Sequence, residues 1–246
     1  MTNTSYKDTG AYLDISGWHF GISAYVNYDS VSRSNNTVTV NGANGVFKIT
    51  TSNGGNSFYG ADVTGRYDFP SGTIRRTQSF GNGTFNVGDV RSSSENTFNI
   101  TVGNTATSVS VRAGARYGGD SITYTSSSSI AVPSAGSPTG QAVSASSVKP
   151  TSASLDASIS NWGTNCTAGT GQRIEYKAST SGTWTNLAYS TSSSHSNIVT
   201  GLKPHTDYNV RTYTINGAGL TGNSSTITFT TQSVVGLTPL LMRLLN

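Results

Sequence analysis

The sequence predicts an all-β protein made of two β-sandwich domains and a short apolar C-terminal tail. The chain has 246 residues, which is enough for two domains of ordinary size. Only 11% of the residues are charged and 34% are hydrophobic, while 28 glycines and abundant Ser, Thr and Asn favour short strands joined by turns. In several segments apolar residues also recur at every second position, which is the period of a strand with one buried face.

The first domain is predicted to span residues 1–135, and the clearest strand lies near its start. Residues 18–28 alternate strictly between two sides, one of them apolar, which predicts a strand. Residues 29–36 are interpreted as a turn. Asn41-Gly42 lies between two apolar stretches, and this dipeptide is the strongest local signal of a hairpin turn.

The rest of the first domain contains predicted loops and a second hairpin. The Gly-rich residues 51–56 and 80–84 are interpreted as loops. A hairpin is predicted around a turn at Gly103-Asn104. Its strands carry the alternating apolar residues Phe98, Ile100, Val102, Val109, Val111 and Ala113.

The domain boundary is placed at residues 133–138, where the alternation is lost and prolines follow a Ser-rich stretch. The second domain is predicted to span residues 138–232. Within it, residues 155–159 and 172–177 alternate as strands do, and residues 226–231 supply the last strand.

The segment 201–211 carries the most specific motif of the chain. Its key residues are Leu202, Pro204 and Tyr208, and in the family that it resembles such a Leu and Pro close a turn and the Tyr begins the next strand. This pattern resembles the fibronectin type III signature, and the resemblance covers residues 138–232. It implies an immunoglobulin-like sandwich with a tyrosine corner, in which the ring packs inward and the hydroxyl bonds to the backbone of the turn.

One position departs from the fibronectin type III pattern. The family usually places a core Trp at the end of its second strand, whereas Ile159 occupies that position here and Trp162 follows it. The core packing is therefore expected to differ from that of the family. The loop that begins at Asn216 contains no Arg-Gly-Asp tripeptide, so integrin binding is not implied.

The first domain shows a second resemblance. An aromatic-rich strand at residues 18–28, the polar stretch 32–40 and a closing Ile-Ala-Val-Pro at residues 130–133 look similar to minor tail proteins of phages that infect Gram-positive bacteria. The resemblance implies assembly into a virion in the host bacterial cytoplasm. It assigns no residue roles.

The last segment, residues 233–246, is the most apolar stretch of the chain. Its candidate interface residues are Val234, Val235, Leu237, Leu240, Leu241, Met242, Leu244 and Leu245. Such a segment is unstable in contact with water, so we expect it to pack on its own domain, on a sister subunit or on a different protein. Disorder and a cloning remnant are the remaining alternatives. The segment is too short to span a bilayer.

Composition argues against several classes of protein. Cys166 is alone, so an intrachain disulfide and a thiol cluster for a metal are excluded. The formal net charge is +4, but the basic residues are scattered singly except for Arg75-Arg76, which argues against nucleic-acid binding. Neither a secretory signal nor a transmembrane run is found, so we expect folding in a reducing cytoplasm and no membrane insertion.

The titratable residues do not form the clusters that an enzyme needs. His19, His195 and His205 stand apart in the sequence and are expected to be solvated. Glu95 and Glu175 fall in different predicted domains, whereas a glycosidase needs two carboxylates at one site. A pair of Asp residues in the first domain stays an open alternative. We predict no catalytic, cofactor-binding or metal-ligating residues.

Binding is the chemistry that the composition favours. Sugar-binding surfaces combine an exposed aromatic ring with amide or carboxylate groups. The candidate aromatic residues are Tyr12, Tyr25, Tyr59, Tyr67, Trp184 and Tyr189. A tyrosine in a β-protein is more often a half-buried part of the scaffold, and this alternative applies to each of them.

Together these observations predict a non-enzymatic structural protein of a tailed-bacteriophage virion. It would be a tail or tail-tip component that forms a homo-oligomer, contacts other virion proteins and touches a host-surface glycan. The alternative is a bacterial surface or exported carbohydrate-binding or adhesion module in which the fibronectin type III domain is a spacer. A glycan hydrolase with carboxylates in the first domain is a third hypothesis. The sequence does not distinguish a tail position from decoration of a capsid.

Overall fold

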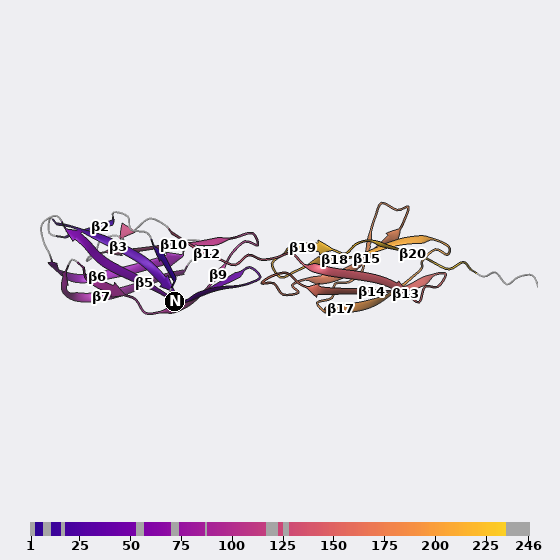
Figure 1. Ribbon diagram of the computed structural model, residues 1–246, viewed down its shortest axis with the longest axis horizontal. Helices are drawn as coiled ribbons and strands as arrows, with labels where there is room; N and C mark the ends of the chain where they lie inside the picture. The colour runs from indigo at the N-terminus through magenta and orange to yellow at the C-terminus, as the bar shows by residue number, and fades with distance from the viewer. Residues whose placement is uncertain are drawn as a thin grey trace, which may run out of the picture. The chain divides into compact units, whose positions relative to one another are not determined.

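The computed structural model describes eight ranges of the chain. These are residues 3–6, 11–15, 18–52, 57–69, 74–86, 88–116, 123–124 and 128–234. Every regular element within them is a β-strand, which confirms the all-β fold class. The chain divides into two compact units, Met1–Ser134 and Ala135–Asn246 (Figure 1).

Unit 1 consists of two antiparallel sheets. The first sheet contains β1 (Asn3–Tyr6), β2 (Ala11–Ile15), β3 (Trp18–Tyr28), β4 (Ser30–Ser34), β5 (Thr37–Ser52), β8 (Val90–Ser92) and β9 (Asn96–Thr101). The second sheet contains β6 (Ser57–Phe69), β7 (Ile74–Asn86), β10 (Ser108–Arg116), β11 (Thr123–Tyr124) and β12 (Ser128–Ala131). The 16 residues of β5 make it long enough to pair with β3, β4, β8 and β9.

The core of unit 1 is built from alternating apolar positions of both sheets, as expected for a sandwich. Phe98 of β9 meets two aromatic rings of β6, with centroids 5.8 Å from Tyr67 and 5.3 Å from Phe69. The other buried apolar residues are Val26, Val38, Val40, Ala43, Phe47, Phe85, Ile100, Val109, Val111, Ala113, Ala115, Ile130 and Val132. Burying one large apolar side chain contributes about 1.5–3 kcal/mol, so this cluster supplies most of the drive to fold.

The hairpin that the sequence predicts at Asn41-Gly42 lies earlier in the chain, between β4 and β5. Asn35 and Asn36 form the turn between β4 and β5, and Asn35 has a φ of 55°. Asn tolerates this left-handed conformation better than most residues. Most of the turn predicted over residues 29–36 is therefore strand β4.

The prediction of a hairpin turn at Asn41-Gly42 is wrong, because both residues lie inside β5. They form a bulge at which the register between β5 and β9 shifts. Gly42 has a φ of 63°, and a Cβ atom at this position would overlap the side chain of Asp29. The bulge separates the half of β5 that pairs with β4 and β9 from the half that pairs with β3 and β8.

Strands β9 and β10 do not pair with each other, although the sequence predicts that they form a hairpin. β9 pairs with β5 in the first sheet, whereas β10 pairs with β6 and β12 in the second. Residues 102–107 therefore cross from one sheet to the other. The apolar residues of both strands face the core in either arrangement, so their alternation does not distinguish a hairpin from a crossover.

Arg33 holds this crossover in place. Arg33 is only 6% exposed. Its guanidinium donates five hydrogen bonds of 2.8–3.3 Å to the carbonyls of Asn35, Gly103, Asn104, Ala106 and Pro133. Carbonyl dipoles thus occupy all five donors, which offsets the desolvation of a buried charge.

Two predicted loops are partly or wholly strand. Residues 80–84 lie in the middle of β7 and pair with β6 where the register shifts twice. Gly81 has a φ of 70°, and such irregular pairing accommodates glycine. Thr51 and Ser52 end β5, while the rest of that predicted loop, residues 53–56, lies outside the described ranges.

Unit 2 has one sheet of three strands and one of five, and all their pairs are antiparallel. The smaller sheet contains β13 (Thr139–Ser146), β14 (Ser152–Asn161) and β17 (Ser194–Thr200). The larger sheet contains β15 (Gly171–Ala178), β16 (Thr185–Asn186), β18 (Asp207–Ile215), β19 (Thr221–Asn223) and β20 (Ile227–Thr230). The strands expected at 155–159, 172–177 and 226–231 correspond to β14, β15 and β20.

The core of unit 2 lies between its two sheets. Its buried members are Ala153, Leu155, Ala157, Ile174, Val199, Leu202, Tyr208 and Val210. The ring of Tyr208 stacks on Phe229, with centroids 5.7 Å apart. Its hydroxyl accepts a hydrogen bond of 2.9 Å from the backbone N–H of Lys203. The Leu202-Pro204 turn is thereby tied to the strand that follows it.

The end of β14, where the family usually has a Trp, is organised around Asn216 instead. Ile159 is buried there, and Asn216 is 2% exposed. The amide of Asn216 donates to the carbonyls of Gly136 and Trp162 at 2.8 and 2.9 Å, and its oxygen accepts from two backbone N–H groups in its own loop. One side chain therefore connects the entry segment with two loops.

The apolar tail is described only at its beginning. Val234 is 64% exposed. The other seven candidate interface residues, Val235, Leu237, Leu240, Leu241, Met242, Leu244 and Leu245, lie outside the described ranges.

Candidate functional site

The outer face of the larger sheet in unit 2 gathers three of the five Lys and Arg residues between positions 135 and 234. In β15 the buried Ile174 points to the core, so Arg173, Glu175 and Lys177 point to the opposite side. Arg211 of β18 pairs directly opposite Glu175. We call this surface the cation–aromatic face, and it comprises Arg173, Glu175, Lys177, Trp184, Tyr189, Arg211 and Tyr213.

Glu175 is the centre of this face, and two guanidinium groups cover it so well that it is only 3% exposed. Arg173 donates from Nε and Nη2 to Oε1 at 2.9 and 2.7 Å. Arg211 reaches Oε2 from Nε and from Nη2, both at 2.8 Å. Both carboxylate oxygens are thus occupied by arginines, so Glu175 is a positioning group and not a general base.

Two tyrosine rings contact the guanidinium group of Arg173. The Cζ atom of Arg173 lies 4.9 Å from the ring centroid of Tyr189 and 4.9 Å from that of Tyr213. Burial raises the pKa of the Tyr189 phenol, and the neighbouring Arg173 charge opposes that rise. Stacking and ion pairing together fix the guanidinium plane.

Trp184 lies beside the other two cations. Its ring centroid is 4.4 Å from Cζ of Arg211 and 5.1 Å from Nζ of Lys177. The indole is held next to the sheet because Thr185, its neighbour in sequence, pairs with Tyr176 of β15. Trp184 and Lys177 are both half-buried, so each still exposes part of its side chain.

The charges on this face do not balance. Three cations stand against one carboxylate, which leaves a formal charge of +2. A rigid, positively charged surface with a partly exposed indole can bind an anion and pack against a ring or a hydrocarbon edge. It has no group positioned for bond-breaking chemistry.

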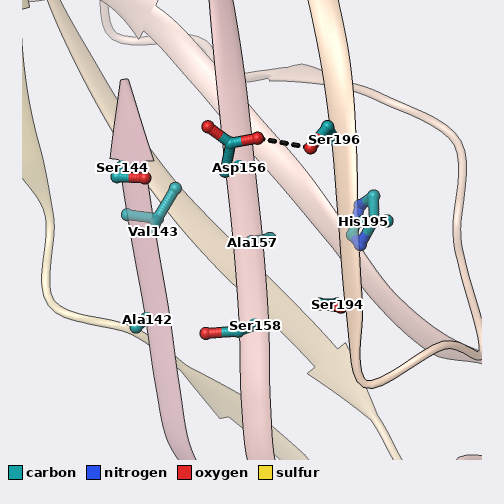
Figure 2. A pocket seen from close by; sticks show the side chains of 9 residues that line it. All are labelled: Ala142, Val143, Ser144, Asp156, Ala157, Ser158, Ser194, His195 and Ser196. Atoms are coloured by element: carbon teal, nitrogen blue, oxygen red, sulfur yellow. Dashed lines mark hydrogen bonds between the residues drawn. The ribbon is translucent and has the colours of Figure 1, made fainter. Parts of the chain in front are cut away.

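The smaller sheet carries a second candidate, an open depression of about 540 Å³ (Figure 2). Its lining residues are Ala142, Val143, Ser144, Asp156, Ala157, Ser158, Ser194, His195 and Ser196. Ser, His and Asp together are the residue types of a nucleophilic triad, so their geometry has to be considered.

That geometry excludes a triad. Figure 2 shows the Asp156 carboxylate bonded to the hydroxyl of Ser196. Ser146 donates to the other oxygen of Asp156 at 3.4 Å. His195 alternates with Ser196 along β17 and lies on the same side of that strand as the buried Val199. Asp156 and His195 therefore belong to opposite faces of the sheet.

The environment of His195 differs from the solvated one that the sequence predicts. Both ring nitrogens are buried, and neither has a hydrogen-bond partner in the described chain. Burial lowers the pKa of His195 below its usual value, because a charged imidazolium would lose its hydration there. His205 is exposed in a turn, as expected, and the side chain of His19 lies outside the described part of the molecule.

The carboxylates of unit 1 do not provide a catalytic pair within the described ranges. Asp68 is buried and ion-paired with Arg66 at 2.9 Å and with Arg112 at 3.2 Å. Glu95 is exposed on the loop before β9, and Asp89 pairs with Arg91 at 3.4 Å. Over the residues that the structure describes, no group of three His, Cys, Asp or Glu side chains could hold a metal ion.

The six candidate aromatic residues fall into three classes. Trp184 and Tyr189 belong to the cation–aromatic face. Tyr67 is a core residue, 1% exposed, whose hydroxyl donates to the carbonyl of Ala43 at 3.1 Å, and Tyr25 is half-buried in β3. The side chains of Tyr12 and Tyr59 lie outside the described part of the molecule.

Sequence reasoning missed the cations that surround Trp184. Arg173, Glu175 and Lys177 alternate with buried residues, so the pattern already places them on one face. The missing information was the register of β15 against β18, which brings Arg211 opposite Glu175.

No helix in the described ranges is long and apolar enough to cross a membrane.

Comparisons with known proteins support the assignment of unit 2. Residues 136–230 match the family model of the fibronectin type III domain. No curated protein sequence matches the chain.

Several solved structures match parts of this chain. The chicken CNTN1 FN1-FN3 domains are 16% identical, with 84% of this chain and 67% of that chain covered and a TM-score of 0.35. A two-domain fibronectin type III segment of chicken tenascin is 16% identical, with 85% and 97% covered and a TM-score of 0.32. The sensor domain of the anti-sigma factor RsgI4 of Pseudobacteroides cellulosolvens is 20% identical, with 40% and 98% covered and a TM-score of 0.31. With TM-scores below 0.5, these likenesses carry no argument about this chain. The family model and the buried Tyr208 corner agree, and residues 136–230 form a fibronectin type III domain.

Proposed function

We propose that this chain is a non-enzymatic structural and adhesion component of a tailed-bacteriophage virion. In this role unit 2 presents the cation–aromatic face to the host surface, and the apolar tail joins the chain to its assembly. The observation that carries the adhesive part is the +2 charge around Trp184 on a face that has no group placed for catalysis.

The state of the buried carboxylates supports a binding role over an enzymatic one. Asp68 and Glu175 are each ion-paired with two arginines. A carboxylate in this arrangement contributes to positioning, because its oxygens are already used. Among the described residues, the Ser, His and Asp side chains of the depression in Figure 2 are divided between two faces of a sheet.

The virion context rests on the sequence. A lone cysteine suits a protein that folds in a reducing cytoplasm, and the first unit resembles minor tail proteins of phages of Gram-positive bacteria. The apolar residues after position 233 suit an assembly contact.

The assembly role is tested by the solution mass of the full chain beside a chain that ends at Gln232, measured by light scattering after size exclusion. We expect a discrete oligomer for the full chain and a monomer for the shortened one. A monomeric full chain that also fails to associate with virion proteins would contradict the virion proposal.

The alternative is a bacterial surface or exported carbohydrate-binding module, and the partly exposed indole of Trp184 is the observation that favours it. Binding of the monomeric full chain to a soluble polysaccharide, with no association between copies, would support this alternative. Binding to walls of Gram-positive cells by an oligomeric chain would support the virion proposal.

A further inference from the structure

We propose that the cation–aromatic face binds an anionic polysaccharide, with an acidic group held between Lys177 and Arg211 and a sugar or polyol unit lying on Trp184. This inference rests on the adhesive part of the proposed function and names its ligand class. The relevant chemistry is a carboxylate or phosphate repeated along a hydroxyl-rich chain.

The first step concerns cations that the domain itself does not neutralise. Lys177 has no carboxylate partner in the described part of the chain, and it stands 5.1 Å from the Trp184 ring. Arg211 uses Nε and Nη2 for Glu175, and its Nη1 has no acceptor among the described residues. Two groups able to donate to an oxyanion therefore lie over one indole ring.

The second step concerns the rigidity of the site. Glu175 fixes the guanidinium of Arg211 through two contacts of 2.8 Å, and Trp184 lies against it at 4.4 Å. A donor that is already ordered loses little conformational entropy when it binds an anion. The second arginine of the cluster, Arg173, is ordered in the same way by Glu175 and two tyrosines.

The third step concerns neutral hydrogen-bonding groups beside the cations. Asn209 pairs opposite Lys177, and its side-chain oxygen accepts from Thr228 at 2.8 Å. Its amide N–H groups have no acceptor in the described chain, so they can donate to a ligand hydroxyl. An anion site, an aromatic surface and an amide donor on one face match an acidic sugar better than a simple ion.

The fourth step separates a polysaccharide from a nucleic acid. Between positions 135 and 234 there are five basic and three acidic residues, so the domain lacks the extended basic stripe that follows a phosphate backbone. The single indole of Trp184 can also stack on one nucleic-acid base. The experiment must therefore include single-stranded DNA as a competitor.

The test uses the full chain and calorimetric or interferometric titration with three soluble polymers and, as the competitor, single-stranded DNA. Poly(glycerol phosphate) and polygalacturonate carry the two kinds of acid group, and dextran is neutral. We expect saturable binding to at least one polyanion, weakening as salt rises, and no measurable binding to dextran. The preferred polymer identifies phosphate or carboxylate as the acid.

The decisive variant is Lys177→Gln, with Lys203→Gln as its matched control. Both remove one positive charge from the same domain, but Lys203 is exposed in the turn before β18 and does not belong to the cation–aromatic face. We expect Lys177→Gln to weaken polyanion binding about three- to tenfold, and Lys203→Gln to change it less than about twofold. Equal losses in the two variants would show nonspecific attraction and overturn the proposal.

Trp184→Leu tests the aromatic part, with circular dichroism and the melting temperature as the check on folding. A folded variant should lose affinity for the polysaccharide but keep the salt dependence of the remaining charge contacts. Affinity for single-stranded DNA that exceeds polysaccharide affinity, and that falls in both Lys177→Gln and Trp184→Leu, would replace the proposed ligand by a nucleic acid.

The outcome for the ligand can be separated from the outcome for the function. If the full chain binds host cell walls while Lys177→Gln and Trp184→Leu bind them equally well, this inference fails and the adhesive function uses another surface. If the full chain binds no cell wall and none of the polymers, the adhesive function itself fails.

Discussion

Among the described side chains, both units contain a buried carboxylate that pairs with two arginines, and this acid is Asp68 in unit 1 and Glu175 in unit 2. Asp68 follows Arg66 by two positions in β6 and pairs opposite Arg112 in β10. Glu175 follows Arg173 by two positions in β15 and pairs opposite Arg211 in β18. Two positions along a strand return to the same face, so the motif arises from strand geometry alone.

The length of the acidic side chain sets how the charges are shared. Arg66 contacts both oxygens of Asp68 at 2.9 and 3.1 Å, and Arg112 shares one of these oxygens at 3.2 Å. The longer Glu175 gives each arginine an oxygen of its own, with all four contacts between 2.7 and 2.9 Å. Among the described contacts, the longer acid orders two guanidinium groups on separate oxygens, whereas the shorter acid shares one oxygen between them.

The buried Arg33 provides the strongest test of what these clusters need. Arg33 has five carbonyl acceptors where the other two sites use a carboxylate. We expect Arg33→Ala to destabilise unit 1 by about 3–5 kcal/mol, because several buried carbonyls lose their donors at once. Urea denaturation followed by circular dichroism measures this loss. A change below about 1 kcal/mol would show that water replaces the guanidinium.

Removing the negative charge of Glu175 or Asp68 should lower the free energy of unfolding less than Arg33→Ala does, because the arginines around these acids are partly exposed. We expect Glu175→Gln and Asp68→Asn each to lower the free energy of unfolding by about 2–3 kcal/mol, as two cations are left beside a neutral amide. Scanning calorimetry should show the effect in the transition of the affected unit. If high salt restores the stability of Glu175→Gln fully, repulsion between the arginines is the whole cause.

Exchanging the acids sharpens the comparison directly. Glu175→Asp should keep the domain folded but lose about 1 kcal/mol, because the shorter side chain cannot give each arginine its own oxygen. The stacking of Arg211 on Trp184 should loosen with it, which a shift in indole fluorescence would report. Asp68→Glu is the matched control in unit 1, and no fluorescence change from Trp184 is expected there.

The smallest expected effect is a pH dependence from His195. Its pKa is lowered in the folded state, so the folded chain binds fewer protons than the unfolded one near pH 6. The stability contributed by neutral His195 is complete above the unfolded pKa and is lost as the pH falls through the folded one. We expect His195→Gln to flatten the fall in melting temperature below about pH 6.5, by roughly 1–3 °C. Identical pH profiles for the two chains would contradict the buried environment of the ring.

Alternation and turn chemistry predicted unit 2 well. The apolar side of β14 and the Leu202-Pro204-Tyr208 motif are local signals, and both lead to the correct strands. The same signals failed in unit 1 where the decision was not local. Asn41-Gly42 suits a bulge as well as a turn, and only the pairing of β5 with several neighbours decides between them.

The candidate site also combines features that local sequence signals reveal with features that depend on strand pairing. Trp184 and Tyr189 could be singled out from the sequence as aromatic residues. Their cationic partners could not, because cross-strand register depends on packing throughout the domain. Arg33 was hidden for a related reason. Its acceptors are carbonyls, which every residue has, and four of the five lie about 70 to 100 positions away in the chain.

The way the chain enters and leaves unit 2 has a mechanical consequence. β13 begins beside the end of β14, whereas β20 ends beside the start of β18, at the other end of the sandwich. A pull between these two points runs along the strands, so the hydrogen bonds of an edge strand must break together and not one by one. Thr231, just after β20, strengthens the end of the domain. Its backbone N–H donates to the carbonyl of Thr206 at 3.0 Å, and its hydroxyl donates to the carbonyl of Lys203 at 2.6 Å. Unit 2 is thus suited to bearing tension, and its lifetime under load is set by the rate of unfolding.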